Sequence, residues 1–260
     1  MIMKNIIIGL MVLVGIVVTI PTKADEIPTG YLALLDSATN NYTGKNYSEA
    51  LRQYTLVTSY GYESPEIWYN MGNCAYRLNS LAESILFYEK SLKLDPGFED
   101  AQYNLRVVNS KILDKIDSVP QLFYERWWFS LQNTFRANTW ALLSLVLFVF
   151  SLVGFLFYYL VDLRWLRKTG FYGALVFLFL FAHSFAFAWK ASGRITRSDY
   201  AIVFSPSVTV KGSPDATSTD LFVLHEGSKV FIGDQVGEWC KVKRSDGKEG
   251  WMPLEAIRKI

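Results

Sequence analysis

The side chains with the greatest chemical reactivity in this sequence are two cysteines and two histidines. Cys240 and His225 lie in the same C-terminal segment, and a Cys/His pair can form a nucleophile with its base. Cys240, however, follows Trp239 in a pattern typical of a strand. The sequence also lacks a pattern for the third residue that would orient the histidine as a base. We therefore expect Cys240 to be structural, and we expect Cys74, in a helical pattern, to be buried.

Other kinds of reactive site lack their usual sequence signatures. Two separate cysteines exclude a zinc ribbon, an iron–sulfur cluster and a disulfide framework, and neither a phosphate-binding glycine loop nor a serine elbow is present. The chain has 26 basic and 24 acidic residues, and the numbers become equal when Lys4 and Lys23 are set aside. Such a chain gains little from releasing counterions on nucleic acid. The sequence predicts a protein that is not an enzyme, with no catalytic residues, metal, cofactor, small-molecule substrate or nucleic-acid partner.

The first 24 residues have the composition of a secretory signal peptide. Lys4 supplies a positive start, the apolar run Ile6–Ile20 follows, and Ala24 ends a small-residue cleavage site. Cleavage would leave Asp25 as the new N-terminus, and the alternative is an uncleaved anchor. In either case Lys4 stays in the cytoplasm, so the chain that follows is expected outside.

Two further apolar runs, 139–161 and 171–189, are long enough to cross a bilayer. Neither carries a formal charge, and about 20 residues of helix span the hydrocarbon core. The short link 162–170 forces a helical hairpin, and its three positive charges against one negative charge favour the cytoplasm. We therefore expect the residues before and after the hairpin, including the linker 190–198, on the opposite side.

One segment next to the spans and one residue within them are unusual. Segment 119–138 is rich in aromatic residues, and we expect it to lie along the membrane surface. His183, inside the second run, permits a proton-relay interpretation. It has no acidic or basic companion in either span, so we expect a structural role and no transport pathway.

A 34-residue period precedes the spans. Residues of the first copy recur 34 positions later, since Glu49-Ala50 and Tyr54 correspond to Glu83-Ser84 and Tyr88. This period is that of the tetratricopeptide repeat. Stretch 66–76 resembles the first helix of that family, with Trp68, Met71 and Gly72 at its W-x₂-L-G positions. We expect a repeat domain over 25–118, with units at 31–64 and 65–98 and a capping helix at 99–113.

The resemblance implies a concave groove that binds a partner protein. Gly72 and Ser84 would let the two helices of a unit approach closely, while Trp68 and Tyr88 fill the adjoining space. The partner-binding residues that the resemblance implies lie on the first helices and the cap: Leu35, Thr39, Tyr42, Glu66, Tyr69, Asn73, Tyr76, Arg77, Asp100, Tyr103 and Lys111. The alternative is that Tyr69 and Tyr76 only pack against neighbouring helices.

The C-terminal residues, 199–260, change to short β-branched and aromatic runs separated by turns. Six strands are expected, at Tyr200–Phe204, Val208–Lys211, Leu221–Leu224, Lys229–Ile232, Trp239–Lys243 and Gly250–Met252. Asp246-Gly247 is a hairpin signal. Leu224–Val230, Gly237–Val242 and Asp246–Trp251 resemble the L-x-x-G-x-x-V, G-x-W-x-x-V and D-G-x-x-G-W motifs of the bacterial SH3-like domain, which implies a small barrel.

This SH3-like resemblance suggests a second binding surface. Trp239, Trp251 and Pro253 would line an aromatic groove for an extended peptide or for cell-wall peptidoglycan. Val210–Pro214 departs from the loop common in the family, which puts wall recognition through this loop in doubt. The alternative is that both tryptophans belong to the core.

The order of these parts also resembles that of the BatE family of the Bacteroides aerotolerance (Bat) operon, as do the runs Ala201–Lys211 and Asp220–Gly227. The resemblance implies the inner membrane of a Gram-negative bacterium, periplasmic folded domains, von Willebrand A-type Bat partners and a role in aerotolerance or envelope stress. The expected fold is multidomain: an all-α tetratricopeptide solenoid, a transmembrane hairpin and an all-β SH3-like barrel. The expected function is a membrane-anchored scaffold, and the alternative is a peptidoglycan-binding module.

Overall fold

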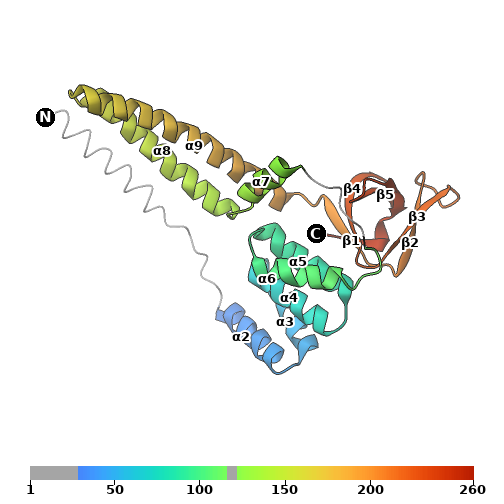
Figure 1. Ribbon diagram of the computed structural model, residues 1–260. Coiled ribbons are helices and arrows are strands. Elements are labelled where there is room, and N and C mark those ends of the chain that lie inside the picture. The colour runs from blue at the N-terminus through green and yellow to red at the C-terminus, as the bar shows by residue number, and fades with distance from the viewer. Residues whose placement is uncertain (1–28, 116–121) are drawn as a thin grey trace. The chain divides into compact units, whose positions relative to one another are not determined.

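The computed structural model describes residues 29–115 and 122–260, and these form two compact units (Figure 1). One unit is a long helical hairpin over 137–192, and the other combines 29–136 with 193–260. The expected signal peptide, 1–24, and the first residues of the expected interfacial segment lie outside the described residues. The architecture is the multidomain one predicted, with a helical repeat region, two apolar helices and an antiparallel β domain.

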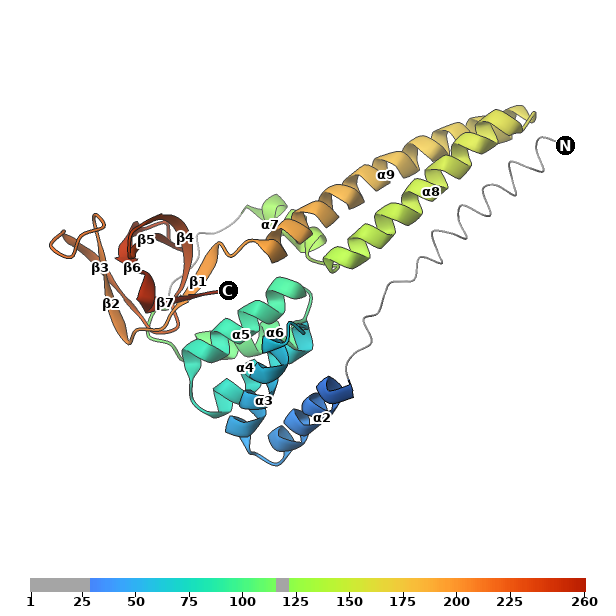
Figure 2. The same cartoon turned by 180° about the vertical axis from the view of Figure 1, so that it is seen from behind.

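The helical repeat region is an array of five helices in which consecutive helices pack against one another (Figure 2). Their bounds are α2 Thr29–Thr43, α3 Tyr47–Ser59, α4 Pro65–Arg77, α5 Leu81–Leu94 and α6 Glu99–Asn109. The start of α4 is set locally, because the Ser64 hydroxyl accepts a hydrogen bond from the Ile67 N–H at 3.2 Å. Pro65 follows at the first helical position, where its missing N–H costs nothing. Helix α5 stops at Leu94, directly before Asp95-Pro96, as expected.

Small residues bring α4 and α5 into close contact. The Ser84 hydroxyl donates to the Gly72 carbonyl oxygen at 2.9 Å, and a Cβ on Gly72 would lie 2.5 Å from Cε1 of Tyr88. The buried Ser91 hydroxyl donates to the Pro65 carbonyl at 2.8 Å. Trp68 is buried as well, and this confirms the predicted packing of small residues against large rings within the unit.

The C-terminal domain is a curved antiparallel sheet of seven strands in the order β3-β2-β6-β5-β4-β1-β7. The strands are β1 Tyr200–Val203, β2 Ser207–Lys211, β3 Asp220–His225, β4 Lys229–Val236, β5 Trp239–Arg244, β6 Glu249–Pro253 and β7 Ile257–Lys259. The expectation of six strands was wrong, because β7 also pairs with β1. Its three residues are too few to show an alternating pattern, and only this long-range pairing defines the strand.

The geometry of the sheet requires glycine at two positions. Gly247 has φ +93° in the turn between β5 and β6, where the Arg244 N–H donates to the Lys248 carbonyl at 2.9 Å. A Cβ on Gly250 would lie 2.5 Å from Val210 and 2.8 Å from the Lys211 carbonyl oxygen, so β2 can approach β6 only with glycine there. The core is formed by the inward residues Ala201, Val203, Val210, Leu224, Val230, Cys240, Val242, Met252, Ala256 and Ile257.

The helical array and the β domain share a hydrophobic cluster within one unit. Ile85 and Val108 of the array pack with the buried Ile202 and Ile260 of the β domain. Polar contacts surround this junction: the Lys229 ammonium lies 2.6 Å from the Glu89 carboxylate. The apolar face of β1 is therefore covered by helices, and the two parts are packed together in one unit.

Helix α7, Phe123–Gln132, follows the helical array and belongs to the same unit. The Arg136 guanidinium, after α7, donates to the carboxylates of Asp95 at 2.6 Å and Glu66 at 3.1 Å. Arg194 donates to the side-chain oxygen of Asn133 at 2.6 Å. Charged hydrogen bonds thus tie the segment after α7 to the helical array.

The second unit is the hairpin of α8, Ala137–Leu160, and α9, Arg164–Thr196. Both helices are long and apolar enough to cross a membrane. The connection between them is shorter than predicted, because residues 164–170 of the expected loop are already helical, as are residues 190–196 of the expected linker. Neither stretch contains a proline, and so nothing in the backbone ends α9 earlier.

Small polar residues pack the hairpin. The Ser151 hydroxyl donates to the Ala174 carbonyl at 3.0 Å, and the Ser184 hydroxyl donates to the Trp140 carbonyl at 2.9 Å. The His183 Nδ1 lies 3.1 Å from the Phe179 carbonyl one turn earlier in the same helix. The polar groups of these three side chains thus find partners on the hairpin's own backbone, as polar residues within an apolar helix pair are expected to do.

Candidate protein-binding groove

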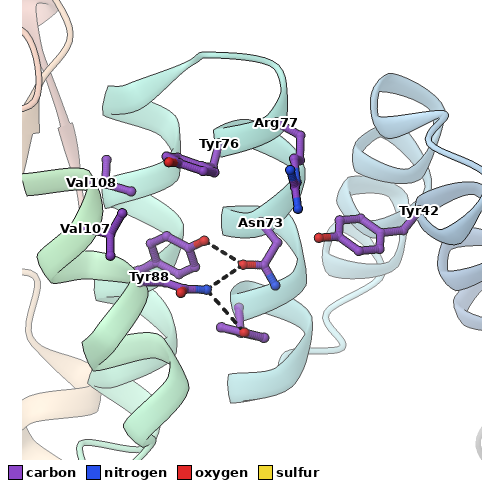
Figure 3. A pocket seen from close by; sticks show the side chains of 9 residues that line it. Tyr42, Asn73, Tyr76, Arg77, Tyr88, Val107 and Val108 are labelled. Atoms are coloured by element: carbon purple, nitrogen blue, oxygen red, sulfur yellow. Dashed lines mark hydrogen bonds between the residues drawn. The ribbon is translucent and has the colours of Figure 1, made fainter. Parts of the chain in front are cut away.

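A cavity of about 200 Å³ opens between α2, α4 and α6, on the face formed by the first helix of each repeat (Figure 3). Five of the predicted groove residues contribute to it, namely Tyr42, Tyr69, Asn73, Tyr76 and Arg77. The others are Tyr88 of α5 and Asn104, Val107 and Val108 of α6. The lining is therefore mainly tyrosine and amide side chains with two valines of α6, which suits a polypeptide that has both backbone and apolar groups to place.

Hydrogen bonds fix the positions of the side chains at the centre of the cavity. The side-chain oxygen of Asn73 accepts from the Tyr88 hydroxyl at 2.6 Å and from the Asn104 amide at 2.9 Å. The Asn104 amide also donates to the Tyr69 hydroxyl at 3.2 Å. Because its oxygen is occupied, Asn73 directs its amide nitrogen toward the side of the cavity where Tyr42 lies (Figure 3). That nitrogen can donate to a carbonyl of a bound chain.

Burial raises the pKa of Tyr88, so its hydroxyl stays protonated and available as a donor to Asn73. This bond connects α5, the second helix of the unit, to the lining of the groove. The Tyr88 ring also lies against Gly72, and the same side chain therefore supports the helix packing and the position of Asn73.

Positive charge lies at the edge of the cavity. Arg77 is exposed, and the nearby Tyr42 hydroxyl raises the pKa of its guanidinium. Among the described residues, Arg77 forms no ion pair with a carboxylate. The Lys111 ammonium donates to the Tyr76 hydroxyl at 2.5 Å and lies 4.5 Å from the centre of that ring. The groove therefore offers a cation to an acidic group of a ligand.

Three predicted groove residues of the first two repeat helices have other contacts. Leu35 packs against the core of the first repeat, and the Thr39 hydroxyl donates to the carbonyl of Leu35 at 2.9 Å. Glu66 directs its carboxylate to Arg136 and does not line the cavity. None of the three adds to the lining around Asn73.

The capping helix is oriented differently from the prediction. Tyr103 is exposed and lies outside the lining, as does Asp100, whereas Asn104 points into the cavity. Sequence reasoning therefore missed Asn104, together with Tyr88, Val107 and Val108. A polar residue beside Tyr103 was the one available signal, but a terminal helix has no following repeat to fix which of its faces turns inward.

The three candidates of the β domain share one face of the sheet. Trp239 pairs directly with Pro253, and Trp251 pairs with Lys241 and Lys211 on the neighbouring strands. Residues two apart in a strand point to the same side, so Trp239 and Lys241 face away from the core residue Cys240. Both tryptophans and Pro253 are half-buried.

The two thiols are inside their respective domains. Cys74 and Cys240 are fully buried, as predicted for Cys74. Burial raises the pKa of Cys74 to about 12, and it also raises the pKa of Cys240. His225 directs its Nδ1 to Asp114 and not to Cys240. Both thiols are thus neutral side chains packed within the fold.

Comparison with known families supports the repeat assignment. The tetratricopeptide repeat model matches residues 65–98, which comprise α4 and α5. No curated protein matches the chain. Tetratricopeptide repeats are modules through which proteins bind other proteins, and the cavity lies on the face formed by the first helix of this matched unit.

Proposed function

We propose that this protein is a membrane-anchored adaptor that holds an extended segment of another protein in the cavity between α2, α4 and α6. The observation that carries the proposal is the amide nitrogen of Asn73, which donates to no side chain among the described residues and is fixed at the centre of a tyrosine-lined cavity with Arg77 at its edge. An amide donor suits the backbone of the bound segment. The guanidinium suits a carboxylate on it.

The apolar helices α8 and α9 support anchoring, because each contains a stretch long enough to span the hydrocarbon core. In this proposal both helices cross the inner membrane, the connection at residues 161–163 is cytoplasmic, and the helical array and β domain are periplasmic. Arg164, Arg167 and Lys168 follow the connection and favour this orientation. By the resemblance in domain order, von Willebrand A-type Bat proteins are the partner class to test first.

Site-specific photo-crosslinking in cells tests the groove directly. A photoreactive residue at Tyr42 should crosslink to a partner protein, whereas the same residue at the exposed Tyr60, directly after α3, should not. Arg77→Glu should abolish the Tyr42 adduct. Arg106→Glu is the matched control, since it reverses an exposed charge outside the cavity, and it should leave the adduct unchanged.

Two outcomes would contradict the groove as the binding site. One is an identical set of adducts from positions 42 and 60. The other is an adduct at position 42 that Arg77→Glu and Arg106→Glu reduce equally, which would indicate a general effect of charge.

A second candidate function, binding of peptidoglycan or of an extended peptide, is favoured by the half-buried Trp239, Trp251 and Pro253 on one sheet face. The full chain in detergent should then sediment with purified wall sacculi. Trp251→Ala should reduce the sedimented fraction, with Val223→Ala as the control, because Val223 is an exposed position on β3 that pairs with Thr209 and with neither tryptophan. Absence of sedimentation with wild-type protein would exclude the wall as ligand.

A further inference from the structure

Helix α7 presents a continuous aromatic stripe. Phe123, Tyr124, Trp127 and Leu131 are all exposed. At about 100° per residue these four positions fall within an arc of about 100° on the helix. Gln132, about 80° beyond the edge of this arc, is only 7% exposed. Trp128 and Phe129, about 40° and 140° beyond the same edge, are also exposed. The helix therefore leaves large apolar side chains around most of its circumference, and the three most exposed of them, Phe123, Tyr124 and Trp127, lie in the stripe.

The chain itself indicates what covers this stripe. Helix α7 ends at Gln132 and the apolar helix α8 begins at Ala137. The intervening backbone can extend over at most about 18 Å. If α8 enters a bilayer near its first residue, α7 cannot be far from the polar headgroups. Tryptophan and tyrosine are enriched in that layer, where a ring can be half in hydrocarbon and half in water.

We propose that α7 lies in the headgroup layer of the membrane, with Phe123, Trp127 and Leu131 directed toward the lipid. The proposal rests on the membrane anchoring proposed above and specifies how the adaptor is held. The salt bridge between Arg136 and Asp95 fixes the segment after α7 to the helical array, and Arg194 holds Asn133 in the same segment. The helical array is therefore docked at the bilayer surface by α7, in addition to being connected through the chain.

Spin-label accessibility on the full chain in phosphatidylcholine–phosphatidylglycerol nanodiscs tests this. Cys74 and Cys240 are fully buried, so an introduced cysteine is selectively labelled. Three labelled variants are compared: Phe123→Cys on α7, Leu142→Cys on an exposed position of α8, and Tyr60→Cys on the helical array. Collision with oxygen, which partitions into lipid, is measured against collision with a water-soluble nickel complex.

The proposal expects the oxygen-to-nickel ratio at Phe123 to be several-fold higher than at Tyr60 and lower than at Leu142. Trp127→Glu should lower the ratio at Phe123 several-fold by placing a charge in the stripe. Tyr103→Glu, at an exposed aromatic residue of α6, is the matched control and should leave it unchanged.

Each alternative result has a distinct meaning. A water-like ratio at Phe123 with a lipid-like ratio at Leu142 overturns the surface role of α7 and leaves the membrane span intact. Low collision with both reagents at Phe123 means that protein covers the stripe, which also overturns it. Water-like ratios at both sites overturn the anchoring as well as this inference. A lipid-like ratio at Phe123 alone supports α7 and overturns the span.

Discussion

The carboxylate of Asp114 accepts hydrogen bonds from both the backbone N–H and the Nδ1 of His225, at 2.7 and 2.8 Å. Ser228 donates a third hydrogen bond to the same carboxylate. Asp114 follows α6 and His225 ends β3, so this one side chain joins the helical array to the β domain. Gly227, with φ +89°, lies between these two donors against Ile112 and Ile85 of the array, where a Cβ would be 2.7 Å from Ile112.

Replacement of Asp114 should loosen this junction. Asp114→Asn removes the charge and one acceptor oxygen, and we expect a loss of about 1–3 kcal/mol because partly buried donors lose their partner. Hydrogen exchange of the full chain should increase around His225–Ser228. Asp220→Asn is the control, since its exposed carboxylate pairs with Lys211 within one hairpin and should contribute about 0–1 kcal/mol. Equal effects of both substitutions would refute a special role for Asp114.

The junction should also weaken in acid. Burial by itself would raise the pKa of Asp114, but the hydrogen bonds from Ser228 and His225 outweigh it and hold the pKa below its ordinary value of 3.8. A carboxyl whose pKa is lowered by folding stabilises the protein fully above its unfolded pKa. This stabilisation is lost as the pH falls through the folded pKa. Denaturant titrations should show that wild-type protein loses more stability below about pH 4 than Asp114→Asn does. Parallel pH profiles would contradict the assignment.

Close packing inside the repeat should make one glycine irreplaceable. Gly72→Ala places a Cβ 2.5 Å from the buried Tyr88 ring, and we expect a loss of about 1–3 kcal/mol from overpacking. Gly30→Ala in α2 meets nothing within 4 Å and should stabilise the chain by about 0.4–1 kcal/mol. Thermal unfolding in detergent measures both. A neutral Gly72→Ala would mean that Tyr88 can move away without cost.

The native cysteines should be unreactive until the fold opens. Cys74 and Cys240 are fully buried, and burial raises the pKa of both thiols, so the reactive thiolate is scarce and inaccessible. Maleimide at neutral pH should label neither in the native chain and both in denaturant. Tyr60→Cys supplies the positive control because position 60 is exposed. Rapid native labelling of Cys240 would show that the β domain opens on the time scale of the reaction.

The central repeat could be predicted because its requirements are local. Gly72, Ser84 and Pro96 are each needed at a particular place in one helical hairpin, and the family match to 65–98 confirms the unit. Strands β1 to β6 follow from alternation and turn residues. Strand β7 could not be predicted, because its three residues become a strand only by pairing with β1, which lies far away in the sequence.

The residues that line the cavity could be predicted only in part. Tyr69 and Asn73 lie on a helix whose inward face is set by the repeat on each side. Helix α6, the last of the helical array, has no following repeat to set its inward face. Packing turns Asn104 inward and Tyr103 outward. Glu66 could also be read as a groove residue until the structure showed Arg136, 70 residues later, beside its carboxylate.

The order and kind of the secondary-structure elements follow from the sequence, because helix stops, strand alternation and apolar length act over a few neighbouring residues. What depends on the tertiary structure is which elements share surfaces. Ile85 lies in a helix of the repeat region and Ile202 in a strand of the β domain, yet they belong to one cluster. Hydrophobic burial is non-directional, so an apolar pattern predicts that a side chain is covered but not which element covers it. The partner that covers it is chosen by packing and by bonds such as that between Asp114 and His225, and these exist only when the chain is folded.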